Sequence, residues 1–251
     1  MRHKIRLLYD GSAFCGWQIQ NNAKTVQGEL EKALGILLGS PVQVVGAGRT
    51  DSEVNAINYI AHFDTPDDVS VNAEQLCYKL NAMLPREMAI EEISPADEEF
   101  HARFGATSRE YHYFIHFRKD PFCEKYSYRM RYPLDIEKMN RAAEVLLRYD
   151  DFTSFAKLNS NNKTNICHIK EALWTRAEDD ADVLVFRICA DRFLRNMVRA
   201  IVGTLVDVGR GRLTVEDFEH IVAARDLSLS SAGAPAVGLF LSNVRDGAVF
   251  E

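Results

Sequence analysis

The sequence lacks the features that would place this 251-residue chain in a membrane, in an oxidising compartment or around a structural zinc ion. No apolar run is long enough to span a bilayer, and residues 1–5 lead into a strand pattern rather than an apolar signal segment. The five cysteines are scattered, odd in number and without a Cys-x-x-Cys pair, which argues against a disulfide framework and against a zinc site. We therefore expect a cytoplasmic protein with reduced thiols, no metal and no membrane association.

The chain also lacks an excess of positive charge. Its formal net charge of −6 and pI near 5.7 argue against a generally adhesive nucleic-acid binder, because such domains are usually basic. Local arginine clusters can nevertheless bind phosphates while an acidic remainder suppresses non-specific binding. The hydrophobic content of 47% is enough to bury a sizeable core, in one large domain or in two packed smaller ones.

Two nucleotide-binding motifs are absent from the most informative stretch, Gly46-Ala47-Gly48-Arg49-Thr50-Asp51. A dinucleotide fingerprint needs a small residue where Asp51 stands, and a phosphate loop needs Gly-Lys-Ser/Thr at its end. The two glycines instead allow a sharp turn, and the positive charge of Arg49 favours an ionised Asp51 carboxylate. This combination is suited to a nucleophile, although most Arg-x-Asp turns are structural.

Hydrophobic periodicity in the first hundred residues predicts alternating strands and helices. In order, we expect a strand over 5–9, a helix capped by Thr25 and ended by Gly39, a strand-like run over 41–45, a strand over 57–63, a helix that begins near Ser70 or Asn72 and stops at Pro85, and a strand through 88–90. Asp51 therefore lies in the connection between two strands.

The second half of the chain repeats this mixture. We expect a strand from Arg109, a helix over 136–148, a hairpin over 169–174 and 183–188, a helix closed by Gly209 and Gly211, a helix capped by residues 214–217, and a strand over 237–244. Arg192, Arg195 and Arg199 are spaced by three and four residues, which predicts one helical stripe. The pattern indicates an α/β (α+β) fold of two similar mixed halves, 1–104 and 105–251, with largely antiparallel sheets flanking a central, positively lined cleft.

Several motifs taken together resemble the tRNA pseudouridine synthase A family, and they match it in order over nearly the whole chain. The matching segments are 9–11 with 16–18, 26–27, 46–51, 80–85, 100–104, 108–111, 151–155, 193–199 with 201–204, and 234–239. The resemblance implies the pseudouridine synthase fold and a reaction without cofactor or metal. In that reaction a uridine in the anticodon arm of tRNA, at position 38, 39 or 40, is cut from its ribose, turned and rejoined through carbon.

The resemblance also implies roles for individual residues. Asp51 is the catalytic nucleophile, Arg199 pairs with it, and Tyr111 contacts the target base after that base has left the stack. With these roles, we expect Arg49, Arg109, Arg192 and Arg195 to meet RNA phosphates and so to position the RNA without reading bases. The family position of Leu239 suggests that it forms the floor of the site. The family also implies a homodimer that holds RNA across two subunits.

Each of these assignments has a simpler structural alternative. Tyr111 alternates with its neighbours as an ordinary cross-strand aromatic does, and an arginine stripe is usually a solvated helix face. Leu239 suits a core position equally well. Isolated histidines, here His62, His101 and His112, are more often structural than catalytic.

The sequence departs from the family beside the proposed nucleophile. The usual Ala-Gly-Val-His-Ala is replaced by Ser52-Glu53-Val54-Asn55-Ala56, so a negative charge is added at Glu53 and a potential positive charge is lost at Asn55. We interpret this as altered substrate choice or RNA affinity with catalysis retained. The alternatives are an RNA-binding relative that has lost catalysis and a small-molecule α/β enzyme, which would show no salt-dependent tRNA binding.

Overall fold

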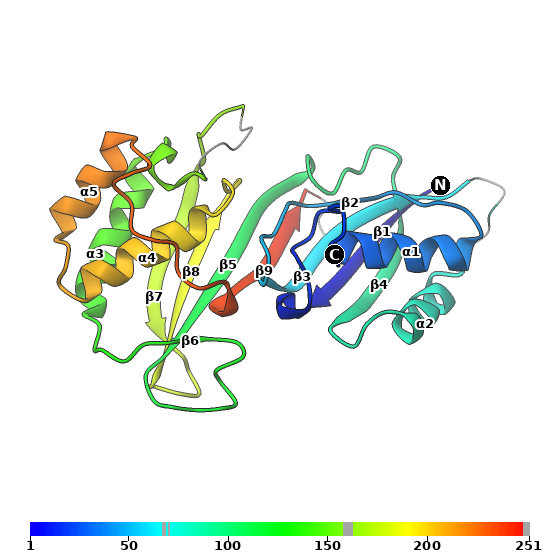
Figure 1. Cartoon of the computed structure of the whole chain (residues 1–251). Helices are drawn as coiled ribbons and strands as arrows, with labels where there is room; N and C mark the ends of the chain where they lie inside the picture. Colours follow the sequence, from blue (N-terminus) through cyan, green and yellow to red (C-terminus); the bar gives the residue numbers. More distant parts are fainter. Residues whose placement is uncertain (67–68, 70, 158–162, 248–251) are drawn as a thin grey trace. The chain divides into compact units, whose positions relative to one another are not determined.

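The computed structural model describes residues 1–66, 69, 71–157 and 163–247 (Figure 1). Its contacts group into a first unit, Met1–Thr107 with Leu241–Glu251, and a second unit, Ser108–Phe240. The last strand, β9 (Leu239–Asp246), begins in the second unit and ends in the first. The division at 104/105 expected from the sequence stays a prediction.

The first unit is a sheet packed against helices. It contains β1 (Arg2–Tyr9), α1 (Val26–Leu38), β2 (Val44–Gly46), β3 (Asn55–Asp64), α2 (Ala73–Met83) and β4 (Met88–Ala96). The strands β4, β1 and β3 lie side by side and antiparallel, and the short β2 pairs with β3. Because strand side chains alternate between faces, Ile5 and Leu7 of β1 are fully buried in the core while their neighbours Lys4 and Arg6 face the other way.

The caps expected from the sequence begin these helices. The Thr25 hydroxyl accepts a hydrogen bond from the Gly28 amide, and the left-handed Gly39 ends α1. The Asn72 side chain caps α2 by accepting from the Gln75 amide at 2.9 Å, so α2 starts at Ala73; Ser70, the other expected start, lies outside the described residues.

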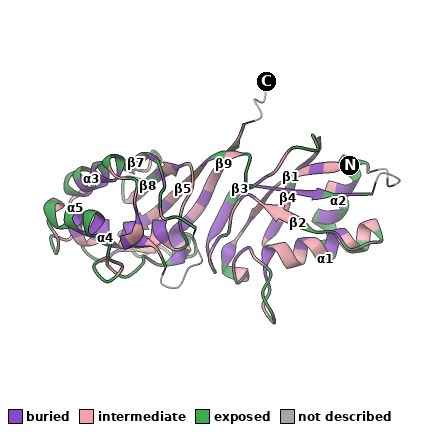
Figure 2. Cartoon of the chain, turned by 90° about the horizontal axis from the view of Figure 1, so that it is seen from above, coloured by how far each residue is buried: buried purple, intermediate pink, exposed green. Residues whose placement is uncertain are grey.

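The second unit has the same mixed character. Its elements are β5 (Ala106–His116), β6 (Tyr128–Arg129), α3 (Ile136–Val145), β7 (Ile169–Arg176), β8 (Val183–Ala190), α4 (Met197–Gly209) and α5 (Val215–Ala224). The strands β5, β8 and β7 are antiparallel neighbours, and β6 runs parallel to the end of β5. Figure 2 shows buried residues along the strands and exposed residues on the outer sides of α3 and α5. The predicted mixed α/β fold with largely antiparallel strands is confirmed.

One helix prediction is wrong. Arg192 and Arg195 precede α4 rather than sharing a helical stripe with Arg199, because Asn196 takes a left-handed conformation (φ 64°) and the helix starts at Met197. The Arg192 guanidinium instead donates to the carbonyls of Thr164 and Ile166, both at 3.1 Å. The phosphate contact expected of Arg192 therefore stays a prediction, without the helix on which it was placed.

No helix within the described part of the chain is long and apolar enough to cross a bilayer.

Candidate active site

The loop that carries Asp51 joins β2 to β3, as the sequence predicts. Gly46, the last residue of β2 before this loop, is closely surrounded by other side chains. A Cβ atom on Gly46 would lie 2.1 Å from the Tyr59 hydroxyl and 2.6 Å from the ring of Trp17. These two aromatic side chains are buried and stacked, with ring centroids 4.1 Å apart. The Tyr59 hydroxyl also donates to the Gly48 carbonyl. Gly46 therefore lets the backbone approach the two rings closely.

Thr50, which precedes Asp51, is held by the last residue of β1 and by the segment that follows this strand. The buried hydroxyls of Tyr9 and Thr50 are hydrogen bonded at 2.9 Å, and the Trp17 amide donates to the Thr50 carbonyl at 3.3 Å. Gly16, in a left-handed conformation (φ 85°), lies so close that a Cβ there would be 2.6 Å from the Thr50 carbonyl oxygen. The Asp51 side chain itself is half-buried. The loop thus presents a carboxylate from a constrained backbone.

The two positions that depart from the family have different environments. Glu53 is exposed and left-handed (φ 66°), a conformation that costs an L-residue with a Cβ about 1–2 kcal/mol. Asn55 is buried, and its Oδ1 accepts from the Gly11 amide at 2.8 Å. The Asn55 side chain therefore tethers the loop to the turn after β1, whereas Glu53 places its charge in solvent.

Arg49 is exposed, and its Nε donates to the side-chain oxygen of Gln18 at 3.3 Å. Gln18 is not among the residues that the sequence predicts for the site, and its contact with Arg49 brings it there. Its place in the matched segment 16–18 is the signal that could have found it, but nothing in the linear sequence shows that residue 18 reaches residue 49.

The second unit holds Tyr111 and Arg109 on β5. Tyr111 is half-buried, and its ring meets Phe193 edge to face with centroids 5.2 Å apart. One terminal nitrogen of Arg109 donates to the Asp191 carbonyl at 2.7 Å. Phe193 lies inside the matched segment 193–199, but no role was predicted for it from the sequence.

Arg199 lies in the first turn of α4 and is bound to the 230s loop. Its Nε donates to the Ala234 carbonyl at 2.7 Å, and the Ala234 amide donates to the Arg199 carbonyl at 2.9 Å. Arg195 is exposed, and Leu239 is 4% exposed at the start of β9. The two hydrogen bonds between Arg199 and Ala234 fix the position of the Arg199 guanidinium relative to α4.

The structure thus distributes the expected site residues over both units. Asp51 and Arg49 belong to the first, and Tyr111, Arg109, Arg195, Arg199 and Leu239 belong to the second. A pairing of Asp51 with Arg199 or with Tyr111 stays a prediction. Groups of three or more His, Cys, Asp or Glu side chains that could hold a metal ion are absent from the described residues.

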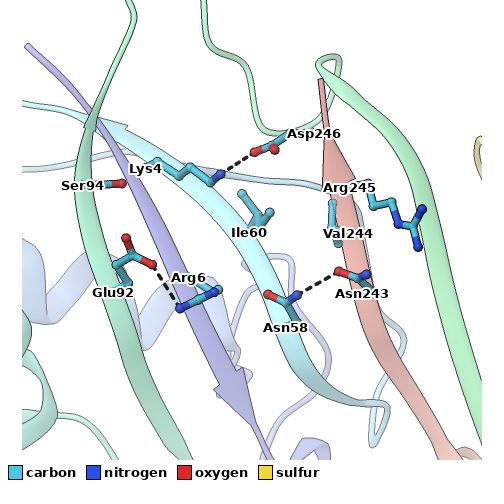
Figure 3. Close-up of a pocket in the computed structure, with 10 residues that line it drawn as sticks. All are labelled: Lys4, Arg6, Asn58, Ile60, Glu92, Ser94, Asn243, Val244, Arg245 and Asp246. Atoms are coloured by element: carbon cyan, nitrogen blue, oxygen red, sulfur yellow. Dashed lines mark hydrogen bonds and ion pairs between the residues drawn. The ribbon is translucent and has the colours of Figure 1, made fainter. Parts of the chain in front are cut away.

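A hollow of about 570 Å³ opens on the first unit's sheet, on the face that points away from the buried Ile5 and Leu7 (Figure 3). It is lined by Lys4, Arg6, Asn58, Ile60, Glu92, Ser94, Asn243, Val244, Arg245 and Asp246, and no expected site residue is among them. Lys4 pairs with Asp246 at 2.6 Å, and the Asn58 amide donates to Asn243 at 2.8 Å. Because these groups already pair with one another, the hollow is a weaker candidate than the Asp51 loop.

The mixed α/β fold with largely antiparallel strands is consistent with the pseudouridine synthase fold. A family model described as tRNA pseudouridine synthase matches residues 142–245. A tRNA pseudouridine synthase A from Parabacteroides distasonis is 50% identical over 97% of this chain and 95% of its own length. The enzyme of that name from Bacillus subtilis is 42% identical over 97% of the chain and 98% of its own length. The chain belongs to the tRNA pseudouridine synthase A family.

Proposed function

We propose that the protein isomerises uridine to pseudouridine in the anticodon arm of tRNA, at positions 38, 39 and 40, which the family resemblance implies. The observation that carries this proposal is the Asp51 loop, in which Tyr9 and Trp17 hold the neighbouring Thr50 while Asp51 itself is only half-buried. The similarity to enzymes named tRNA pseudouridine synthase A over nearly the whole chain supports it. In the proposed site Arg199 pairs with Asp51 and orients it.

The chemistry needs one nucleophile and a base that has left the stack. The bond between the ribose and the uracil nitrogen breaks, the uracil turns, and a carbon–carbon bond forms at its C5. The C5 hydrogen leaves to solvent as a proton and the freed nitrogen takes up a proton, so the product is an isomer of the substrate. The Asp51 carboxylate serves by attack on the ribose anomeric carbon or on uracil, or by removing a ribose proton. The Tyr111 ring faces the extruded base, Arg49, Arg109 and Arg195 meet phosphates, and Leu239 lines the floor.

We further propose a cytoplasmic homodimer in which tRNA lies across two subunits. Sedimentation equilibrium of the free protein and of its tRNA complex measures both stoichiometries. A monomer that remains monomeric with tRNA bound and fully active would contradict this part of the proposal.

The experiment that tests the activity is tritium release from tRNA labelled at C5 of uridine. The wild-type protein should release tritium, and Asp51→Asn should abolish release while retaining most tRNA binding, because the substitution removes the negative charge but keeps the side-chain volume. Mapping pseudouridine in tRNA from cells lacking the protein identifies the positions. Binding without any release by the wild-type chain would instead indicate a relative without turnover, an alternative that no observation favours.

A further inference from the structure

Arg49 does not end in solvent alone; it begins a chain of polar side chains that runs into the first unit. Its Nε donates to the Gln18 side-chain oxygen at 3.3 Å, and the Gln18 amide nitrogen donates to the Gln27 side-chain oxygen at 2.8 Å. The Gln27 amide nitrogen then donates to a Glu31 carboxylate oxygen at 2.9 Å. Both glutamines and Glu31 are half-buried.

The far end of this chain is anchored in secondary structure. Gln27 and Glu31 are one turn apart on α1, and the same Glu31 oxygen accepts the backbone amide of Val44 in β2 at 2.9 Å. The Gln27 amide also donates to the Val44 carbonyl at 3.0 Å, and its side-chain oxygen accepts the Ile19 amide at 3.2 Å. The helix, the strand and the loop that carries Gln18 are therefore tied together.

The direction of every link is set by the two ends. A guanidinium can only donate hydrogen bonds and a carboxylate can only accept them, so each glutamine amide between them has one compatible orientation. Flipping Gln18 would turn its amide nitrogen toward the Arg49 guanidinium and its oxygen toward the Gln27 oxygen. Because the Gln18 amide nitrogen is hydrogen bonded to Gln27, the Gln18 oxygen is a fixed acceptor for Arg49.

We propose that Gln18 is a positioning residue that orients Arg49 for a substrate phosphate beside the target nucleotide. This inference rests on the proposed function, in which Arg49, two residues before Asp51, meets the RNA backbone. Because Gln18 holds the Arg49 Nε, the two terminal nitrogens of the guanidinium are ordered before the phosphate binds. Pre-ordering one long side chain lowers the entropic cost of binding, which corresponds to about two- to tenfold in affinity.

The test replaces Gln18 by methionine, which keeps the length of the side chain and removes both polar groups. Gln20→Met is the matched control, because Gln20 lies in the same loop and donates to the Cys15 carbonyl at 2.7 Å instead of contacting Arg49. We expect Gln18→Met to raise the KM for tRNA about two- to tenfold with kcat little changed, and Gln20→Met to leave both near the wild-type values. Equal effects of the two variants would overturn the proposal.

A double-mutant cycle separates positioning from a merely structural role. In an Arg49→Met background, Gln18→Met should cause no further rise in KM and no further loss of salt dependence in tRNA binding. Additive effects of Gln18→Met and Arg49→Met would refute positioning.

The tRNA affinities measured in this double-mutant cycle do not depend on turnover. If wild-type protein released no tritium, the proposed function would fail while the salt-dependent affinities still decided whether Gln18 acts through Arg49.

Discussion

Replacing Gly46 by alanine should destabilise the protein and disable the Asp51 loop. The new methyl group would lie 2.1 Å from the Tyr59 hydroxyl and 2.6 Å from the Trp17 ring, and these side chains are 0% and 2% exposed. Neither has room to move away, so we expect an overpacking cost of ~1–3 kcal/mol. Displacing the Tyr59 hydroxyl from the Gly48 carbonyl adds about 1 kcal/mol.

The loss of ~2–4 kcal/mol should appear as a fall of about 4–16 °C in Tm for a chain of this size. The control is Gly48→Ala, because a Cβ there would meet nothing within 4 Å, and its free energy of unfolding should change by less than about 0.5 kcal/mol. Scanning calorimetry compares the two variants. Tritium release by Gly46→Ala should fall by roughly a hundredfold, since a displacement of about 1 Å in a catalytic group has that effect.

A Gly46→Ala protein that melts at the same temperature as Gly48→Ala would show that the close contacts of Gly46 with Tyr59 and Trp17 do not limit which side chain fits there. A Gly46→Ala protein that is destabilised yet turns over at the wild-type rate would show that close packing at Gly46 supports the fold without placing Asp51.

Two further predictions concern charge. Glu53→Gly should tighten tRNA binding about threefold at low salt, because a charge ~7 Å from a phosphate costs roughly 0.6 kcal/mol in water, and the gain should disappear near 1 M salt; filter binding at both salt concentrations measures it. Burial, together with the positive charge of Arg2, lowers the pKa of His62 from 6.5 to about 4. The unfolded chain takes up this proton near pH 6.5 and the folded chain only near pH 4. His62 should therefore lower the free energy of unfolding by up to roughly 3 kcal/mol as the pH falls from 6.5 to 4. Urea denaturation of the wild type and of His62→Gln should therefore diverge over this interval, and parallel pH profiles would contradict the assignment.

The starts of the helices could be predicted because their determinants are local. Thr25 and Asn72 each cap a helix, and Thr214 with Asp217 forms the capping box expected from their spacing of three residues. The same local reasoning failed at Arg192 and Arg195. Their spacing suits a helix, but Asn196 is left-handed and Arg192 is bound to carbonyls 28 and 26 residues away. Spacing alone could not show that tertiary contacts outweigh helix propensity there.

The amino-acid order was sufficient for the alternation of strands and helices, for the aspartate between two strands and for the motifs that mark the family, since each depends on near neighbours in the chain. What holds the aspartate became visible only in three dimensions. Tyr9 reaches Thr50 across 41 residues, and Gln18 reaches Arg49 across 31. Such pairings depend on how β1, α1 and β3 pack, and a linear pattern of polar and apolar residues carries no information about which distant side chains that packing brings together.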